Sequence, residues 1–122
     1  MENKKTLVIG ASTNLERYSN MAIRALRRHG NDVVALAKRN GKVADVAFLT
    51  TFPSQQQNIH TVTMYIGPRN QPEYYNLILS LNPARVIFNP GTENNLFAQK
   101  LKEKGIETVE ACTLVMLSIG QY

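Results

Sequence analysis

The sequence predicts an α/β fold in which five parallel strands form one doubly wound sheet. Short apolar, β-rich runs alternate along the chain with segments whose apolar residues follow the period of a helix. Gly, Pro or Asn residues follow most of the strand-like runs and mark turns. Parallel strands joined by right-handed crossovers account for both observations, because parallel neighbours need long connections that are normally helical.

The first expected strand is Thr6–Ile9, and the small residues Gly10–Ser12 follow it at once. Ser19 or Asn20 is the expected cap of the first helix, and Gly30 ends that helix, because glycine adopts the left-handed conformation at least cost. A strand, a small-residue turn and a helix N-terminus favour a phosphate, since backbone N–H groups and the helix dipole attract an anion. The alternative is that an α/β protein simply needs small residues at its first turn.

The second expected strand is Asn31–Ala37, whose continuous apolar run is typical of a strand covered on both faces. It ends in the polar turn Lys38–Gly41. From Gly41 to about His60 the pattern is weak, with at most a short strand or edge piece around Val43–Leu49. A crossover of this length normally carries a helix, and none is evident, so the sequence leaves this stretch open.

Three further strands complete the expected sheet, namely Thr61–Ile66, Ala84–Phe88 and Ile106–Val109. We expect the strand order 3-2-1-4-5, in which the third strand lies beyond the second and the topological switch lies beside the first. Ligands bind such sheets outside the carboxyl ends of the strands at this switch. The turns expected to meet there are Gly10–Ser19, Lys38–Gly41, Tyr65–Arg69 and Asn89–Glu93.

Helices are expected between and after these strands. Pro72 suits the first turn of one helix, whose apolar residues recur at helical spacing up to Leu81. Thr92 is the expected cap of the next helix, which ends at Gly105. The apolar segment Cys112–Ile119 is the expected last helix.

The composition indicates a soluble globular protein with one domain, residues 1–122. Hydrophobic residues make up 43% and charged residues 19% of the chain, which is ordinary for such a protein. No run approaches the about 20 apolar residues of a membrane span, and Met1–Lys5 lacks the apolar stretch of a signal peptide, so we expect a cytoplasmic protein. The net charge of +5 suits an anionic ligand. No basic tract is present, so nucleic acid is not expected as a partner.

The choice of nucleotide depends on two departures from the dinucleotide-binding pattern. That pattern needs three glycines and an acidic residue near the end of the second strand. This chain has Gly10 alone, and Lys38 and Arg39 stand where the acid is needed. Both departures argue against NAD, and the basic pair suits a ribose with an extra phosphate, as in CoA and NADP. The alternative for this pair is a solvated turn.

Several of these segments resemble the small CoA-binding domain family, whose Rossmann-like fold is shared with the N-terminal domain of the succinyl-CoA synthetase alpha subunit. The resemblance lies in Gly10–Ser12 followed by Arg17–Ser19, in Val62–Pro68, in Val86–Glu93 and in Glu110–Cys112. It covers nearly the whole chain, but the stretch from residue 41 to residue 58 departs from the family pattern.

The resemblance implies that the ligand is coenzyme A or an acyl-CoA. It places the pyrophosphate near the Gly10 turn and the start of the following helix, and the adenosine 3′-phosphate near Lys38 and Arg39. The candidate binding residues are Gly10, Ala11, Ser12, Asn14, Arg17, Tyr18, Ser19, Lys38, Arg39, Tyr65, Gly67, Pro68, Asn89, Pro90 and Gly91.

We therefore expect a nucleotide-binding module without catalysis of its own and without a metal. His29 and His60 stand alone in the sequence, and no catalytic triad order or paired carboxylates stand out. Two other classes stay open: an NADP-type enzyme subunit, and a regulatory protein that senses nucleotide or redox state. Cys112 is either a buried inert thiol or a thiol at the ligand mouth that forms a mixed disulfide with CoA. The sequence leaves open a partner protein or a homo-oligomer.

Overall fold

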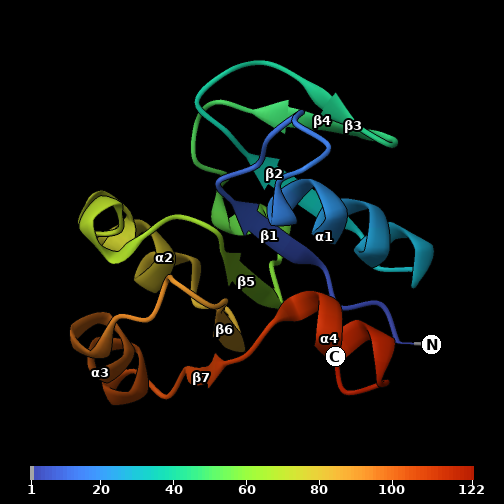
Figure 1. The fold of residues 1–122 in the computed structure, drawn as a ribbon. Coiled ribbons are helices and arrows are strands. Elements are labelled where there is room, and N and C mark those ends of the chain that lie inside the picture. Colours follow the sequence, from blue (N-terminus) through green and yellow to red (C-terminus); the bar gives the residue numbers. More distant parts are fainter. Residues whose placement is uncertain (1) are drawn as a thin grey trace.

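The structure is a computed structural model that describes residues 2–122; Met1 of the N-terminal stretch lies outside the described residues. It contains a seven-stranded sheet with the order β3-β4-β2-β1-β5-β6-β7 (Figure 1). Each pair of neighbouring strands is parallel except β3 and β4, which form an antiparallel hairpin. The strands are β1 (Thr6–Ile9), β2 (Val33–Leu36), β3 (Lys42–Val43), β4 (Val46–Leu49), β5 (Thr61–Met64), β6 (Arg85–Phe88) and β7 (Glu107–Glu110).

The α/β class and the mostly parallel sheet are confirmed, but the predicted five strands in the order 3-2-1-4-5 are wrong. The third expected strand, now β5, pairs with β1 along its whole length instead of lying beyond β2. The place beyond β2 is taken by β4, which pairs with it only at Ala35–Phe48 and Leu36–Leu49. β3 has only two residues, and in β4 buried residues alternate with exposed ones, so neither has the continuous apolar run from which the central strands were predicted.

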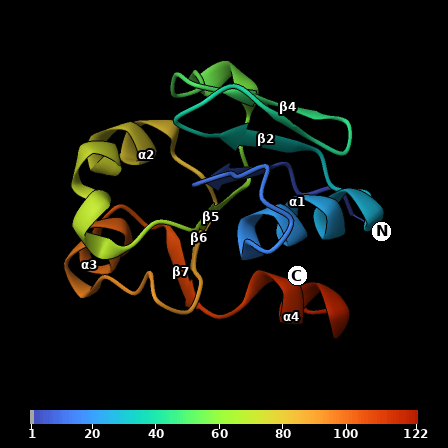
Figure 2. The same cartoon turned by 45° about the horizontal axis from the view of Figure 1, so that its top comes forward.

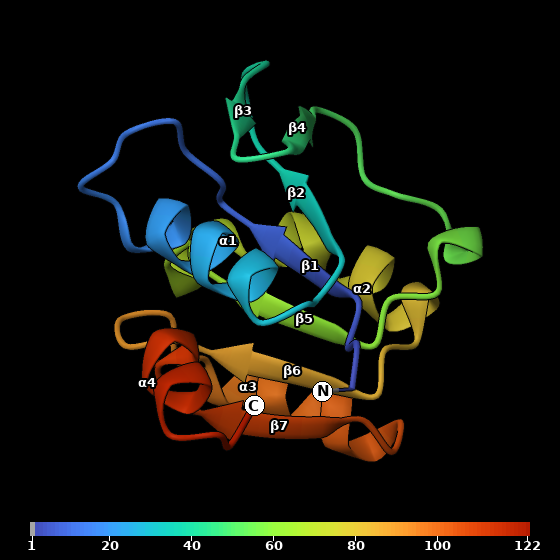
Figure 3. The same ribbon diagram turned by 90° about the vertical axis from the view of Figure 1, so that its right-hand side faces the viewer.

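Helices cover both faces of the sheet. Figure 3 shows α1 (Tyr18–Arg28) and α4 (Thr113–Ser118) on one face, and Figures 1 and 2 place α2 (Tyr75–Leu81) and α3 (Asn95–Glu103) on the other. Three short 3-10 segments, Gln55–Gln57, Pro68–Asn70 and Pro72–Tyr74, lie in the connections. The expected end of α1 is confirmed, because Gly30 has a φ of +80° directly after the C-cap residue.

Two predicted helix caps are wrong. The N-cap residue of α1 is Arg17, and Asn20 instead bonds Ser12 and Arg24 through its side chain. The cap of α3 is Asn94 and not Thr92, because the Asn94 Oδ1 accepts the N–H of Phe97 at 3.0 Å. Each error is a shift of two or three residues; Asn94 is a favoured capping residue, whereas Arg17 is not and makes no side-chain cap bond.

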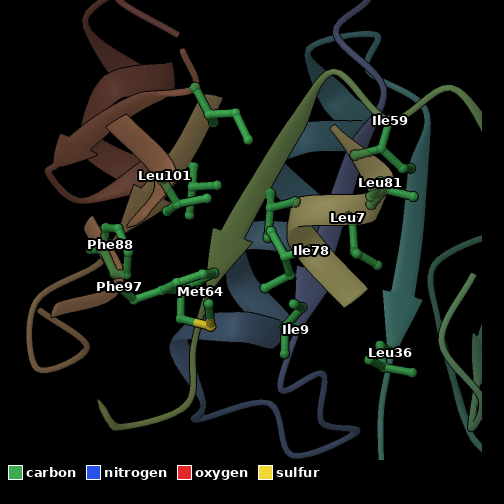
Figure 4. Packing of buried hydrophobic residues seen from close by; sticks show 13 residues of the cluster. Leu7, Ile9, Leu36, Ile59, Met64, Ile78, Leu81, Phe88, Phe97 and Leu101 are labelled. Atoms are coloured by element: carbon green, nitrogen blue, oxygen red, sulfur yellow. The ribbon is translucent and has the colours of Figure 1, made fainter. Parts of the chain in front are cut away.

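The core lies on both sides of the sheet because consecutive strand residues face opposite sides. Leu7 and Ile9 of β1 pack under α2 and α3 with Met64, Phe88 and Phe97 (Figure 4). On the other side, Val8 packs with the apolar residues of α1 and α4, which include Ile23, Leu26 and Leu117.

The strand register aligns the carboxyl ends of the central strands. Ile9 pairs with both Leu36 and Met64, and Met64 pairs with Phe88. The turns that follow these residues therefore meet at one edge of the sheet, which confirms the predicted convergence of the four turns.

Candidate functional site

Two adjoining clefts open at the carboxyl edge of the sheet, and Gly10 and Ser12 line both of them. One cleft, here the helix-side cleft, has a volume of about 500 Å³ and lies against the start of α1. The other, here the hairpin-side cleft, has a volume of about 400 Å³ and lies against the β2–β3 turn and β4. Both volumes fall in the range of roughly 300–1,000 Å³ that is usual for small-molecule sites. The two clefts share Gly10 and Ser12 and lie at the topological switch beside β1.

Gly10 lines both clefts at a position with no room for a side chain. Its φ is +97°, and a Cβ added there would lie 2.9 Å from Ile66 Cγ2 and 3.0 Å from the Tyr65 carbonyl oxygen. The N–H groups of Gly10 and Ala11 both donate to the Leu36 carbonyl, at 3.1 and 3.0 Å. These two N–H groups hold β1 to β2 and so are not among the donors that we expected to attract an anion at this turn.

The first turn of α1 offers the free donors instead. Among residues 2–122, no acceptor is bonded to the N–H groups of Tyr18 and Ser19. The first turn of α1 contains no acidic residue, and the N-cap residue is the exposed Arg17. The positive end of the helix dipole and a guanidinium therefore stand together at the wall of the helix-side cleft.

The loop that leads into α1 is held by its own hydrogen bonds. Asn14 donates its N–H to Ser12 Oγ at 3.1 Å, and its Oδ1 accepts the N–H of Glu16 at 2.9 Å. Asn20 Nδ2 donates to the Ser12 carbonyl at 3.0 Å. Asn14 thus orders this loop and lines neither cleft.

The hairpin-side cleft combines an apolar wall with a basic rim. Phe48 and Ile66 contribute to the apolar wall, and Lys38 and Arg39 lie exposed at the rim. The Phe48 N–H donates to the Gly41 carbonyl at 2.8 Å, which fixes the basic turn against β4. The ion pairs in residues 2–122 all involve another arginine, Arg27, so no carboxylate neutralises this rim.

The β5 and β6 turns form the far wall of the helix-side cleft. Tyr65, Pro90 and Thr92 line it. The Tyr65 hydroxyl is buried and has no hydrogen-bond partner among the described residues, and burial raises the pKa of this phenol well above its ordinary value. Tyr65 therefore stays protonated at neutral pH.

Asn89 is a structural residue behind this wall. Its Nδ2 donates to Thr63 Oγ1 at 2.7 Å and to the Met64 carbonyl at 2.8 Å, and its Oδ1 accepts the N–H of Thr113 at 2.9 Å. These bonds join β5, β6 and α4 below the clefts. Cys112, the half-buried N-cap residue of α4, lines neither cleft.

The structure brings ten of the fifteen candidate residues to the two clefts, and five of them do not line either one. The ten are Gly10, Ala11, Ser12, Arg17, Tyr18, Ser19, Lys38, Arg39, Tyr65 and Pro90. The five are Asn14, Gly67, Pro68, Asn89 and Gly91.

Sequence reasoning missed seven further lining residues. Five of them stand inside the four predicted turns and could have been included: Thr13, Glu16, Asn40, Ile66 and Thr92. Ala37 immediately precedes one of those turns. Phe48 lies in the stretch for which we expected at most a short strand or edge piece, and nothing in the sequence linked that piece to the site.

Two classes of site are not seen in the part of the chain that the structure describes. No helix in residues 2–122 is long and apolar enough to cross a bilayer. Over the same residues, no three His, Cys, Asp or Glu side chains gather as ligands for a metal ion.

A mostly parallel α/β sheet with two clefts at its switch point defines the class of small-ligand-binding α/β domains. Within this class, the family model of the CoA binding domain matches residues 4–118. The chain belongs to the CoA-binding domain family.

Solved structures with the same fold agree with this membership. The crystal structure of an uncharacterized protein is 44% identical, with a TM-score of 0.95 over 100% of both chains. A hypothetical protein from Pyrococcus horikoshii OT3 is 24% identical, with a TM-score of 0.84 over 96% of this chain and 83% of that chain. A protein from Thermus thermophilus is 20% identical, with a TM-score of 0.82 over 98% and 91% of the two chains. The last two likenesses show the fold alone. No curated protein matches the chain.

Proposed function

We propose that the protein is a binding module for coenzyme A or an acyl-CoA and has no catalytic activity of its own. The observation that carries this proposal is the pair of adjoining clefts at the carboxyl edge of the sheet, which share Gly10 and Ser12. CoA has three chemically different parts, and the clefts offer a matching environment for each in the same order. Membership of the CoA-binding domain family supports the same ligand.

The adenosine end belongs in the hairpin-side cleft. Phe48 and Ile66 give the purine an apolar wall, and Lys38 and Arg39 at the rim suit the 3′-phosphate. A charge-assisted hydrogen bond contributes roughly 1.5–3 kcal/mol. Because both side chains are exposed, solvent screening should bring the value toward the low end of this range.

The pyrophosphate belongs beside the start of α1, in the part of the helix-side cleft that adjoins Gly10 and Ser12. The free N–H groups of Tyr18 and Ser19 and the guanidinium of Arg17 are the donors that suit it. The pantetheine arm then lies in the helix-side cleft, between the start of α1 and the wall that contains Tyr65 and Pro90.

NADP is the second candidate, because it also has an extra ribose phosphate that the basic rim would accept. An NADP-dependent enzyme subunit or a nucleotide sensor would use the same rim. The lone Gly10 of the turn favours CoA over a dinucleotide, since the dinucleotide pattern has three glycines.

Thermal stability with four ligands tests the proposal. At about a hundred times its dissociation constant, a ligand stabilises the folded protein by roughly 2.7 kcal/mol. We expect CoA to raise the melting temperature more than 3′-dephospho-CoA or NAD, and we expect the double variant Lys38→Ala/Arg39→Ala to lose this preference. The matched control is Lys100→Ala/Lys102→Ala in the last part of α3, which removes the same charge away from the clefts.

The four ligands distinguish the alternatives. A greater effect of NADP than of CoA would favour the NADP-type reading. Equal stabilisation by NAD and CoA, or unchanged discrimination in the Lys38→Ala/Arg39→Ala variant, would show that the basic rim is only a solvated turn.

A further inference from the structure

Gln71 is a fully buried polar residue in the connection between β5 and α2, and it lines neither cleft. Its side-chain amide makes three hydrogen bonds. The Nε2 donates to the Ile66 carbonyl at 3.0 Å and to the Thr92 carbonyl at 2.8 Å, and the Oε1 accepts the Asn94 Nδ2 at 2.9 Å. Both N–H groups and the oxygen of this amide are therefore bonded within the protein.

The two carbonyl partners of Gln71 belong to different clefts. Ile66 lies in the turn after β5 and lines the hairpin-side cleft, whereas Thr92 lies in the turn after β6 and lines the helix-side cleft. Ile66 also packs closely at the shared residue Gly10, where an added Cβ would lie 2.9 Å from its Cγ2. One amide group thus joins a wall residue of one cleft to a wall residue of the other.

Asn94 holds this amide in its orientation. The Asn94 Nδ2 donates to the Gln71 Oε1 and, at 2.7 Å, to the Tyr75 hydroxyl. Its Oδ1 caps α3 by accepting the N–H of Phe97. A main-chain carbonyl only accepts hydrogen bonds, so a reversed Gln71 amide would leave both carbonyls without a donor. The network therefore ties the turns after β5 and β6 to the starts of α2 and α3 in one arrangement.

We infer that Gln71 is a positioning residue that holds the two clefts at the spacing that one CoA molecule needs. This inference rests on the proposed function, in which the adenosine end lies in the hairpin-side cleft and the pantetheine arm in the helix-side cleft. A ligand that occupies both clefts gains affinity from their fixed spacing, because binding of one end brings the other end to a high effective concentration. A fragment that occupies one cleft gains nothing from this spacing.

A purely structural role of Gln71 leads to a different expectation. Loss of buried hydrogen bonds lowers the free energy of unfolding wherever these bonds lie. At a temperature at which the variant is fully folded, lower stability alone does not change the affinity for a ligand. A loss of affinity that is confined to the ligand occupying both clefts therefore identifies positioning.

Titrations of the whole chain, followed by calorimetry and by NMR shifts of the amides, compare CoA with two fragments. Adenosine 3′,5′-bisphosphate represents the end in the hairpin-side cleft, and 4′-phosphopantetheine represents the end in the helix-side cleft. The test variant is Gln71→Met, which keeps the length of the side chain and removes its three hydrogen bonds. We expect its affinity for CoA to fall about tenfold, while each fragment binds within about twofold of its affinity for the wild type.

Two further variants complete the test. The matched control is Asn31→Leu, because Asn31 is also buried, accepts the Lys4 N–H at 2.8 Å and lines neither cleft. We expect this control to be less stable but to bind all three ligands as the wild type does. Asn94→Asp keeps the oxygen that caps α3 and removes the donor that orients Gln71. It should lose affinity for CoA alone, by a smaller factor, and it decides the question if Gln71→Met does not fold.

The possible failures separate this inference from the proposed function. If the wild type and Gln71→Met bind CoA equally well, or if the fragments lose as much affinity as CoA, Gln71 is not a positioning residue while the proposed function stands. The same holds if Asn31→Leu loses affinity for CoA to the same extent, or if CoA binds the wild type no more tightly than its tighter fragment. If neither CoA nor a fragment binds the wild type, both proposals are wrong.

Discussion

The central strands and the β3–β4 hairpin contribute to the same site but are built in different ways. In β1, β5 and β6 all four residues of each strand are buried, and each strand pairs with its neighbours along its full length. In β4, buried residues alternate with exposed ones, and only two of its residues pair with β2. The central strands therefore form a fully paired and buried edge, whereas β4 holds Phe48 beside the basic rim through a two-residue pairing with β2 and leaves alternate residues exposed. The comparison indicates that the two ends of the proposed ligand meet walls of unequal stability.

The largest expected effect is on the central side, at Gly10. Gly10→Ala places a Cβ at 2.9 Å from Ile66 Cγ2 on a backbone with φ of +97°. Left-handed strain and overpacking together should lower the free energy of unfolding by about 3 kcal/mol. Urea denaturation measures this loss. Gly105→Ala is the matched control, because φ is +79° there but nothing lies within 4 Å of the added Cβ, so strain alone should cost about 1 kcal/mol. Equal losses in the two variants would contradict the close packing at Gly10.

The next largest expected effect is the loss of Asn89, which lies directly after β6 at the carboxyl edge of the central strands. Asn89→Ala leaves the Met64 carbonyl and the Thr113 N–H without their partner in a buried environment. We expect the free energy of unfolding to fall by about 2 kcal/mol, measured by the same urea denaturation. Asn76→Ala, at an exposed position on α2, should change it by less than about 0.5 kcal/mol. A neutral Asn89→Ala would show that this side chain does not join β5, β6 and α4.

The same contrast explains what the sequence could predict. Thr6–Ile9, Thr61–Met64 and Arg85–Phe88 follow from their apolar and β-branched content, and the turns after them follow from Gly10 and from Asn89-Pro90-Gly91. The order of the strands could not be predicted in this way. A right-handed crossover allows β5 to pair either with the free edge of β1 or with the outer edge of β2. The choice depends on whether another strand already pairs with the outer edge of β2.

That other strand, β4, is set by contacts distant in the sequence. Gly41 shows this most clearly, since a Cβ there would lie 2.7 Å from Thr13 Cγ2 and 3.0 Å from Phe48 Cδ2. The β1–α1 loop, the basic turn and β4 pack together around Gly41. Because these contacts join segments distant in the sequence, they produce no periodic pattern of apolar residues in any one segment. The contribution of β4 to the hairpin-side cleft could therefore not be predicted from the sequence, whereas most residues of the helix-side cleft could be predicted from the turns.

Ala44 offers a way to strengthen the hairpin. It has a φ of +54° in the turn between β3 and β4, a conformation that costs a residue with a Cβ about 1–2 kcal/mol. Ala44→Gly removes this strain but increases the entropy of the unfolded chain, so we expect a net stabilisation of about 0.5 kcal/mol. Thermal unfolding measures it. Ala47→Gly, at an exposed position within β4, should be destabilising instead, and stabilisation by both variants would refute the explanation from strain.

The smallest expected effect concerns the ion pair that ties the hairpin to α1. Arg27 donates to both carboxylate oxygens of Asp45, at 2.9 and 2.7 Å, and this hydrogen bonding holds the pKa of Asp45 below its ordinary value of 3.8. A lowered pKa in the folded state means that the pair stabilises the hairpin above pH 3.8 and that this contribution is lost as the pH falls below it. We expect the amides of Val46–Leu49 to exchange faster than those of Thr61–Met64 at pH 7, and the stretch from residue 41 to residue 58 to be the most mobile segment without ligand. Asp45→Asn should increase exchange in the hairpin alone, with little change in global stability because the pair is exposed. Exchange in Val46–Leu49 as slow as in Thr61–Met64 would mean that the two walls of the site are equally stable.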